Sequence, residues 1–280
     1  MIDTGTVGLI LILANIIFSY QGLTNEAFFD GYKLDVDKIL ISKDYKRIVS
    51  SGFLHVSWMH LLFNMLSLYA FSVVTDAAHG GIQFLIIYFS GLIGGGILAV
   101  YLHRHHGDYS AVGASGAVCG VIFAAIALYP GIGIGFFGLP FSIPGWLYGI
   151  LFLLYSMYGI RSKSDNIGHE AHLGGALLGM TAALIMNPVA LADNYVTIMA
   201  IAAPAIGLMY IIIARPDLLM IDNLFFKRHK NSYSIDHLYN ERKRITQKEI
   251  DKILDKINKK GMKSLSLEDR IKLKKYSKTK

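Results

Sequence analysis

A serine between glycines, Ser115 in the stretch GASGAVCG (113–120), stands at the start of a long apolar run. Three more polar side chains lie inside such runs: His60 and Asn64 in HLLFNMLS, and His172 in GHEAHLGG. Polar groups are costly in hydrocarbon, so the few that a membrane-spanning run retains are informative. A serine hydroxyl needs a base to become a nucleophile, and histidine titrates near neutral pH. This combination indicates acyl transfer, with Ser115 as nucleophile and His172 as base.

The remaining polar groups could stabilise the oxyanion of an acyl-transfer intermediate. His60 and Asn64 are four residues apart, which places them on one helical face, one turn apart. With the backbone N–H of Ser115 at a helix N-terminus, they provide hydrogen-bond donors of the required kind. No Asp or Glu lies inside any predicted span, which implies a Ser–His dyad rather than a triad.

Each of these residues also has a structural or metal-binding interpretation. A serine in a span often bonds its own i−4 carbonyl, and a lone His or Asn can tie helices together. The stretch HEAH (169–172) is one residue short of the zinc signature HExxH. The loop residues His103, His105 and His106 could bind a metal opportunistically. We expect neither a catalytic metal nor another cofactor.

The elements that position these residues are predicted to be membrane helices. Of the 280 residues, 53% are hydrophobic and only 17% are charged, and the mean hydropathy is +0.44, which is too apolar for an ordinary soluble domain. The second, fourth and sixth predicted spans enter the membrane from the same side, so their polar residues fall at similar depth and could converge on one pocket. Seven runs without Asp, Glu, Lys or Arg have about the length that a bilayer requires: 4–20, 54–75, 82–101, 111–130, 146–160, 171–187 and 195–214.

Glycines are spaced for close helix contact on two of these runs. Gly116 and Gly120 form a GxxxG face on the fourth run, and Gly175 and Gly179 form another on the sixth. We assign Gly113 to the same helix-packing set. Contact between the two faces would bring Ser115 to His172.

The first run and the loop after it complete the membrane part. The stretch MIDTGTV has no Lys or Arg, which favours a retained first helix over a cleaved signal peptide. The region between the first two runs is too polar to cross a bilayer and is predicted to form short helices at the interface. The single cysteine, Cys119, excludes an intrachain disulfide.

The C-terminal segment has a different composition. Residues 215–280 hold 19 of the 27 Lys and Arg, interleaved with nine acidic residues, which disfavours nucleic-acid binding. The segment is either a solvated charged tail or a small helical hairpin. The hairpin would pair a helix with i, i+3, i+4, i+7 spacing and a C-capping Gly261 with a second helix opened by SLED (266–269). Its apolar positions are Ile250, Ile253, Leu254, Ile257, Ile271 and Leu273.

Taken together, the motifs resemble the rhomboid family of intramembrane serine proteases. The matching stretches are YKRIVSSGFLHVSWMHLLFNMLSLYAF, GASG and AHLGG, in the family's order and on its second, fourth and sixth helices. The resemblance implies an all-α, polytopic membrane helix bundle. It divides the chain into a six-helix protease core (1–190), an additional seventh transmembrane helix (191–215) and a basic, partly helical soluble tail (216–280).

The resemblance also implies an activity, the cleavage of single-span membrane proteins by an endopeptidase embedded in the lipid bilayer, in the inner membrane of a bacterium. Ser115 would be the nucleophile and His172 the general base, with His60 and Asn64 on the oxyanion side. Arg47 matches the arginine of the family's first-loop motif. The family usually has Tyr or Phe, stacked on the catalytic histidine, where this chain has Cys119.

Two functions other than proteolysis would leave different marks in the sequence. A catalytically silent relative would bind and escort membrane proteins, but such relatives lose the dyad that this chain keeps. A transporter or channel would carry charged groups near the midplane of the membrane, and the predicted spans carry none there.

The loop charges and the family resemblance predict opposite sides of the membrane for the active site. The first, third and fifth loops hold five, one and two Lys or Arg, and the even loops hold none. The positive-inside rule therefore makes the active-site side cytoplasmic, whereas bacterial rhomboids typically open to the outside. Long soluble segments translocate regardless of charge, so the basic tail counts for little.

Overall fold

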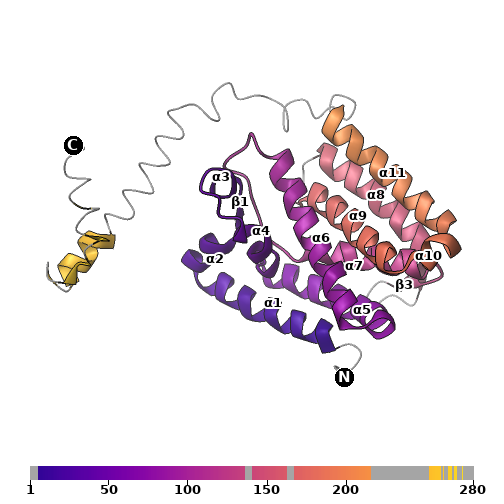
Figure 1. The fold of residues 1–280 in the computed structure, drawn as a ribbon, viewed down its shortest axis with the longest axis horizontal. Coiled ribbons are helices and arrows are strands. Elements are labelled where there is room, and N and C mark those ends of the chain that lie inside the picture. The colour runs from indigo at the N-terminus through magenta and orange to yellow at the C-terminus, as the bar shows by residue number, and fades with distance from the viewer. Residues whose placement is uncertain are drawn as a thin grey trace. The chain divides into compact units, whose positions relative to one another are not determined.

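A computed structural model shows the chain as a helical bundle, in which one helix fills each of the seven predicted apolar runs (Figure 1). The structure describes residues 6–135, 141–162 and 167–215, with 252–259, 261, 264–266, 268–269 and 273 in the C-terminal segment. The seven helices are α1 (Thr6–Thr24), α5 (Trp58–His79), α6 (Gly81–Leu102), α7 (Ser115–Leu128), α8 (Gly145–Ser162), α9 (His169–Met186) and α11 (Tyr195–Ala214).

The predicted all-α membrane bundle is confirmed, although the helices differ in length. Within the described part of the chain, α1, α5, α6 and α11 are long and apolar enough to cross a membrane by length and composition. The central helix α7 has only 14 residues and is apolar but shorter. A short helix, α10 (Pro188–Asp193), connects α9 to α11.

Helices α6, α7 and α9 pack at the centre of the bundle, with α1 and α5 on one flank and α8 and α11 on the other (Figure 1). Every residue of α7 from Gly116 to Leu128 is buried. A Cβ atom added to Gly120 would lie 3.0 Å from the Gly175 carbonyl oxygen. One added to Gly179 would collide with the backbone of Gly120. The central helices therefore touch backbone to backbone, as the glycine spacing predicts.

The segment between α1 and α5 forms short helices, as predicted, and also a strand. Side-chain caps start two of the helices: the Phe28 N–H donates to Asn25 Oδ1 (3.1 Å) and the Lys38 N–H donates to Asp35 Oδ1 (3.0 Å). The elements are α2 (Glu26–Tyr32), β1 (Leu34–Asp35), α3 (Val36–Leu40), α4 (Lys46–Ser50) and the 3₁₀ helix η1 (Ser51–Phe53).

Two short antiparallel ribbons were not predicted. Strand β1 pairs with β2 (Ser110–Ala111), so that Leu34 lies opposite Ala111. Strand β3 (Gly133–Gly135) pairs with β4 (Ser142–Pro144) between α7 and α8. The first ribbon ties the loop after α1 to the loop that leads into α7.

Arg47 fixes the loop between α1 and α5 from within. Its guanidinium is buried and donates to Asp44 Oδ2 at 2.9 Å and to the carbonyl oxygens of Asp30 at 2.9 Å and Lys33 at 2.8 Å. A planar group with several donors suits this task, because it can join separate backbone segments at once.

The chain divides into two compact units, residues 1–227 and 228–280. In the second unit, residues 252–259 are helical, and Ile253 and Leu265 are buried with Ile257 and Leu273 packed against them. The Asp269 N–H donates to Ser266 Oγ while the Ser266 N–H donates to Asp269 Oδ2, both at 3.1 Å, which is a reciprocal capping box. The predicted apolar positions Ile250 and Ile271 lie outside the described residues.

Candidate active site

Ser115 and His172 lie in hydrogen-bonding contact, with 2.6 Å between Ser115 Oγ and His172 Nε2. Ser115 is the first residue of α7, and His172 lies in the first turn of α9. The glycine contacts between these helices allow the approach. Gly95 on α6 adds to it, because a Cβ there would collide with the Ala171 carbonyl oxygen. The predicted convergence of the serine and the histidine is present.

The loop before Ser115 is held in a conformation that requires glycine. Gly113 has φ of 136°, and its N–H donates to the Ser51 carbonyl oxygen at 3.0 Å. A Cβ there would lie 2.9 Å from His60 Cε1 and 3.5 Å from Ser115 Oγ. Gly113 therefore lies in the loop before α7 and keeps the space between Ser115 and His60 open. This role differs from the helix-packing role that we predicted for it.

His60 approaches Ser115 from α5, which Ser57 caps by accepting the His60 N–H at 3.1 Å. The ring nitrogen Nε2 lies on the Gly113 side, and Nδ1 is buried without a hydrogen-bond partner. Asn64 follows one turn later, is buried, and donates one amide N–H to the His60 carbonyl oxygen at 3.0 Å. The amide group has a second N–H, which that bond leaves unused.

A further histidine, His55, contacts the backbone next to the serine, a role that the sequence did not reveal. Ser19 donates to the Phe53 carbonyl oxygen (2.9 Å) and lies 2.8 Å from His55 Nδ1, so Nδ1 carries the ring proton. His55 Nε2 then accepts the N–H of Ala114 at 3.4 Å. Hydrogen bonds thus link Ser19 on α1, through His55, to Ala114, the residue before Ser115.

The histidines and the acid of HEAH take separate partners. His169 is buried against α8, where a Cβ on Gly159 would collide with its ring, and the Tyr155 ring lies edge-on at 4.9 Å. The Glu170 carboxylate accepts hydrogen bonds from His103 and Tyr109. No group of three metal-ligating side chains occurs among the residues that the structure describes.

The prediction that no acid lies inside a span is wrong at two helix ends. Helix α9 begins at His169 and so includes Glu170, and α5 extends past the predicted end to include Asp76. Both side chains are buried. Neither lies near the middle of its helix.

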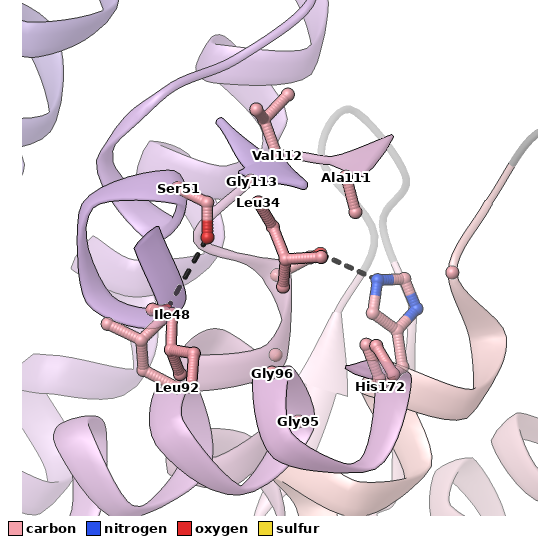
Figure 2. A pocket seen from close by; sticks show the side chains of 15 residues that line it. Leu34, Ile48, Ser51, Leu92, Gly95, Gly96, Ala111, Val112, Gly113 and His172 are labelled. Carbon is pink, nitrogen blue, oxygen red and sulfur yellow. Dashed lines mark hydrogen bonds between the residues drawn. The ribbon is translucent and has the colours of Figure 1, made fainter. Parts of the chain in front are cut away.

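A pocket opens beside the serine and the histidine (Figure 2). Its polar side chains belong to Ser51, Ser115 and His172, and glycines of the central helices form part of its wall. The other walls are apolar and are formed by Leu34, Ile48, Leu92, Ala99, Ala111 and Val112. A small apolar side chain next to a reacting carbonyl would fit this lining.

Cys119, one turn after Ser115 on α7, is 7% exposed and faces away from bulk water. Tyr148 on α8 packs against the apolar cluster that contains Cys119. The His169 ring lies 6.1 Å from that of His172, tilted by 70°. A histidine ring thus borders His172, and position 119 is buried in a cluster to which α8 contributes an aromatic ring.

This fold and site define an integral, multi-pass membrane protein in which polar residues of α5, α7 and α9, each buried or half-buried, lie around a serine. The chain belongs to the rhomboid family: the Rhomboid domain matches residues 42–189, more than half of its length. A second match, to a family of unknown function (DUF6576), covers residues 233–279.

Individual relatives support the same family. Rhomboid protease AarA of Providencia stuartii is 26% identical over 231 residues, which cover 72% of this chain and 80% of that protein. Rhomboid protein 1, mitochondrial, of Saccharomyces cerevisiae is 28% identical over 179 residues, 59% of this chain and 51% of that protein. Rhomboid protease GluP of Bacillus subtilis (strain 168) is 23% identical over 192 residues, 68% of this chain and 36% of that protein. The chain therefore spans about half the length of its yeast relative.

Proposed function

We propose that the protein is an intramembrane serine endopeptidase that cleaves transmembrane segments of other membrane proteins. The observation that carries the proposal is the 2.6 Å contact between Ser115 Oγ and His172 Nε2. A neutral imidazole at this distance accepts the hydroxyl proton, which is the first requirement of a serine nucleophile. The relatives AarA and GluP, which are named as rhomboid proteases, support the same activity.

The reaction follows from this pair. Ser115 Oγ attacks the carbonyl carbon of the scissile peptide bond while His172 takes the hydroxyl proton. The tetrahedral intermediate collapses, and His172 gives that proton to the leaving amine, which leaves an acyl group on Ser115. Water then attacks the acyl carbon and gives a proton to His172. His172 passes this proton to Ser115 Oγ as the acyl–oxygen bond breaks, which frees the serine and releases the new carboxyl terminus.

Oxyanion stabilisation is available on the α5 side of the serine. The first N–H groups of α7 have no partner within the helix and point at this end, where no side chain caps them. His60 presents Nε2 beside Gly113, and Asn64 retains one amide N–H. A hydrogen bond from each of these donors to the substrate oxygen would strengthen as negative charge develops on that oxygen.

The substrate must expose a peptide bond that a membrane helix normally hides. A helix that enters the site has to unwind locally, so we expect helix-destabilising Gly or Pro and small side chains near the cut. The small apolar pocket beside Ser115 supports this preference.

The proposal extends to the division of the chain and its location. The catalytic core would be residues 1–190, with 191–215 as an additional transmembrane helix and 216–280 as a soluble tail. The bacterial relatives that are named as proteases support the inner membrane of a bacterium. Fractionation of the source cells tests the location.

The decisive experiment is cleavage of a model single-span substrate by purified protein in detergent. Ser115→Ala and His172→Ala are each expected to abolish cleavage with little change in the melting temperature, because neither reacting atom has a substitute. Activity should survive EDTA and be blocked by a fluorophosphonate that labels Ser115. Substantial activity in either variant, or loss to EDTA with recovery on adding zinc, contradicts the dyad. Wild-type protein that binds the substrate but never cleaves it is a silent relative.

A further inference from the structure

A second buried polar cluster lies beside the serine–histidine pair and links α9 to the loop before α7. Its centre is Glu170, which is 6% exposed and sits in the first turn of α9. Carboxylate Oε1 lies 3.0 Å from His103 Nε2 and accepts the Tyr109 hydroxyl at 3.0 Å. The His103 and Tyr109 rings stack at 3.5 Å with 8° between their planes. The three side chains thus form one unit.

This unit is fixed on both sides. His103 is the C-terminal cap of α6, a helix that packs along α9. The carbonyl oxygen of Tyr109 accepts the Val36 N–H at 3.2 Å, directly before the β1–β2 ribbon. Burial, and secondarily the charge of Glu170, raises the pKa of Tyr109, so its hydroxyl keeps the proton that it donates.

The chain from this unit to the nucleophile is short. Tyr109 precedes Ser115 by six residues, of which Ser110 and Ala111 are held in the ribbon. Glu170 precedes His172 by two residues on the same helical turn. One carboxylate therefore connects the segment that carries the base to the segment that carries the nucleophile, independently of the bond between them.

Glu170 is not placed as the third member of a triad. Residues two apart on a helix point about 200° apart, so the carboxylate and the imidazole project from different faces of α9. Its hydrogen bonds go to His103 and Tyr109 instead. Its influence on the reaction must pass through backbone placement.

We propose that Glu170 is a positioning residue, which through Tyr109 and His103 sets the distance between Ser115 Oγ and His172 Nε2. This inference rests on the proposed serine mechanism, since it concerns the same two atoms. A displacement of about 1 Å between reacting groups can cost about 10²-fold in rate, so a tether on both segments matters for turnover.

Tyr109→Phe is the sharpest variant, because it removes one hydroxyl and leaves the ring to stack on His103. The control is Tyr88→Phe on α6, where the hydroxyl of a fully buried tyrosine accepts a hydrogen bond from Asn15 Nδ2 at 3.2 Å. We expect Tyr109→Phe to lower kcat about 10-fold with KM nearly unchanged. Tyr88→Phe should lower the melting temperature by a similar amount and leave kcat unchanged. Equal kcat losses in the two variants would overturn the proposal.

Substitutions at Glu170 give a graded series that does not depend on Tyr109. Glu170→Gln keeps an oxygen that accepts from Tyr109, whereas Glu170→Ala removes the acceptor that Tyr109 and His103 share. We expect kcat to fall in the order wild type, Glu170→Gln, Glu170→Ala. If Glu170→Ala fails to fold, the comparison of Glu170→Gln with wild type decides. A kcat equal to wild type in Glu170→Gln together with an unaffected Tyr109→Phe rejects the positioning role.

A substrate-free measurement separates this inference from the proposed function. The rate at which a fluorophosphonate labels Ser115 reports activation of the serine by His172 alone. Labelling of wild type that is about 10-fold faster than labelling of Tyr109→Phe supports the positioning role. If both proteins label equally fast, the serine mechanism stands and the positioning role is rejected. If wild type does not label at all, the serine mechanism itself is rejected.

Discussion

The central helices and the flanking helices of the bundle make contact in different ways. In the apolar stretch of α6 that is long enough to cross a membrane, 56% of the residues are buried. The corresponding shares are 33% in α1, 33% in α5 and 28% in α11. Glycine backbones touch at the centre, while large apolar side chains such as Leu9, Phe63 and Tyr210 face outward on the flanks. Backbone contacts leave little room for adjustment, because no side-chain rotamer can yield. The residues that must hold a fixed distance, Ser115 and His172, stand on the central helices.

Substitution at the central contact is expected to have the largest effect. In Gly179→Leu, the new side chain would collide with the backbone of Gly120. Overpacking usually costs about 1–3 kcal/mol, and here the neighbour is main chain, so we expect the upper end or more and loss of cleavage. Thermal unfolding in detergent, with the cleavage assay, measures both. A variant that melts like wild type would show that α7 and α9 separate easily.

Donors on a flanking helix are expected to matter less than the dyad, though still strongly. His60→Ala and Asn64→Ala should each lower kcat about 10²–10³-fold without abolishing cleavage, because each supplies one oxyanion donor among several. The control is Asn15→Ala on α1, since Asn15, like Asn64, donates to its own i−4 carbonyl oxygen, at 2.9 Å. That variant should lose stability and keep kcat. A complete loss in Asn64→Ala equal to that of Ser115→Ala would give Asn64 another role.

Position 119 tests the boundary between the two kinds of contact. Cys119 is buried on the central helix, in the cluster against which Tyr148 packs from the flank, so an added ring has to compete for space. We expect Cys119→Phe to cost about 1–3 kcal/mol of stability and part of the activity. The pair Cys119→Phe with Tyr148→Ala should recover stability. Unchanged stability in Cys119→Phe alone, with equal or higher activity, would show that the space beside His172 is open.

A glycine on a flanking helix should give the smallest change, and one of opposite sign. Gly207 on α11 is exposed, and a Cβ there would meet nothing within 4 Å. Gly207→Ala is therefore expected to stabilise the protein by about 0.5–1 kcal/mol, because alanine loses less conformational freedom in a helix. The melting temperature measures it, and kcat should not change. A loss of stability would indicate that α11 has a partner at this face.

The sequence predicted the helices and the convergence of the site because both depend on regular spacing. Uncharged runs of membrane length marked the helices, and helix parity placed Ser115 and His172 on the same side. GxxxG spacing predicted which helix faces meet. The roles of His60 and Asn64 remain predictions.

Features that depend on irregular backbone were missed. A two-residue strand such as β1 has no periodicity to detect, so its pairing with β2 left no signal. The sequence predicts Gly113 only as a packing residue, because φ of 136° is a property of the folded loop. The partners of Glu170 lie 61 and 67 residues away in sequence, and only the fold brings them together.

The burial of Cys119 has a practical consequence for mapping how the protein sits in its membrane. It is the only thiol in the chain, and it is shielded inside α7. A maleimide that cannot cross membranes would therefore meet almost no background, and a cysteine introduced at the exposed Tyr45 or Leu191 would report its own compartment. Labelling of intact cells would show which of these two positions faces the outside. That result decides whether the loop charges or the family resemblance predicts the side of the active site correctly.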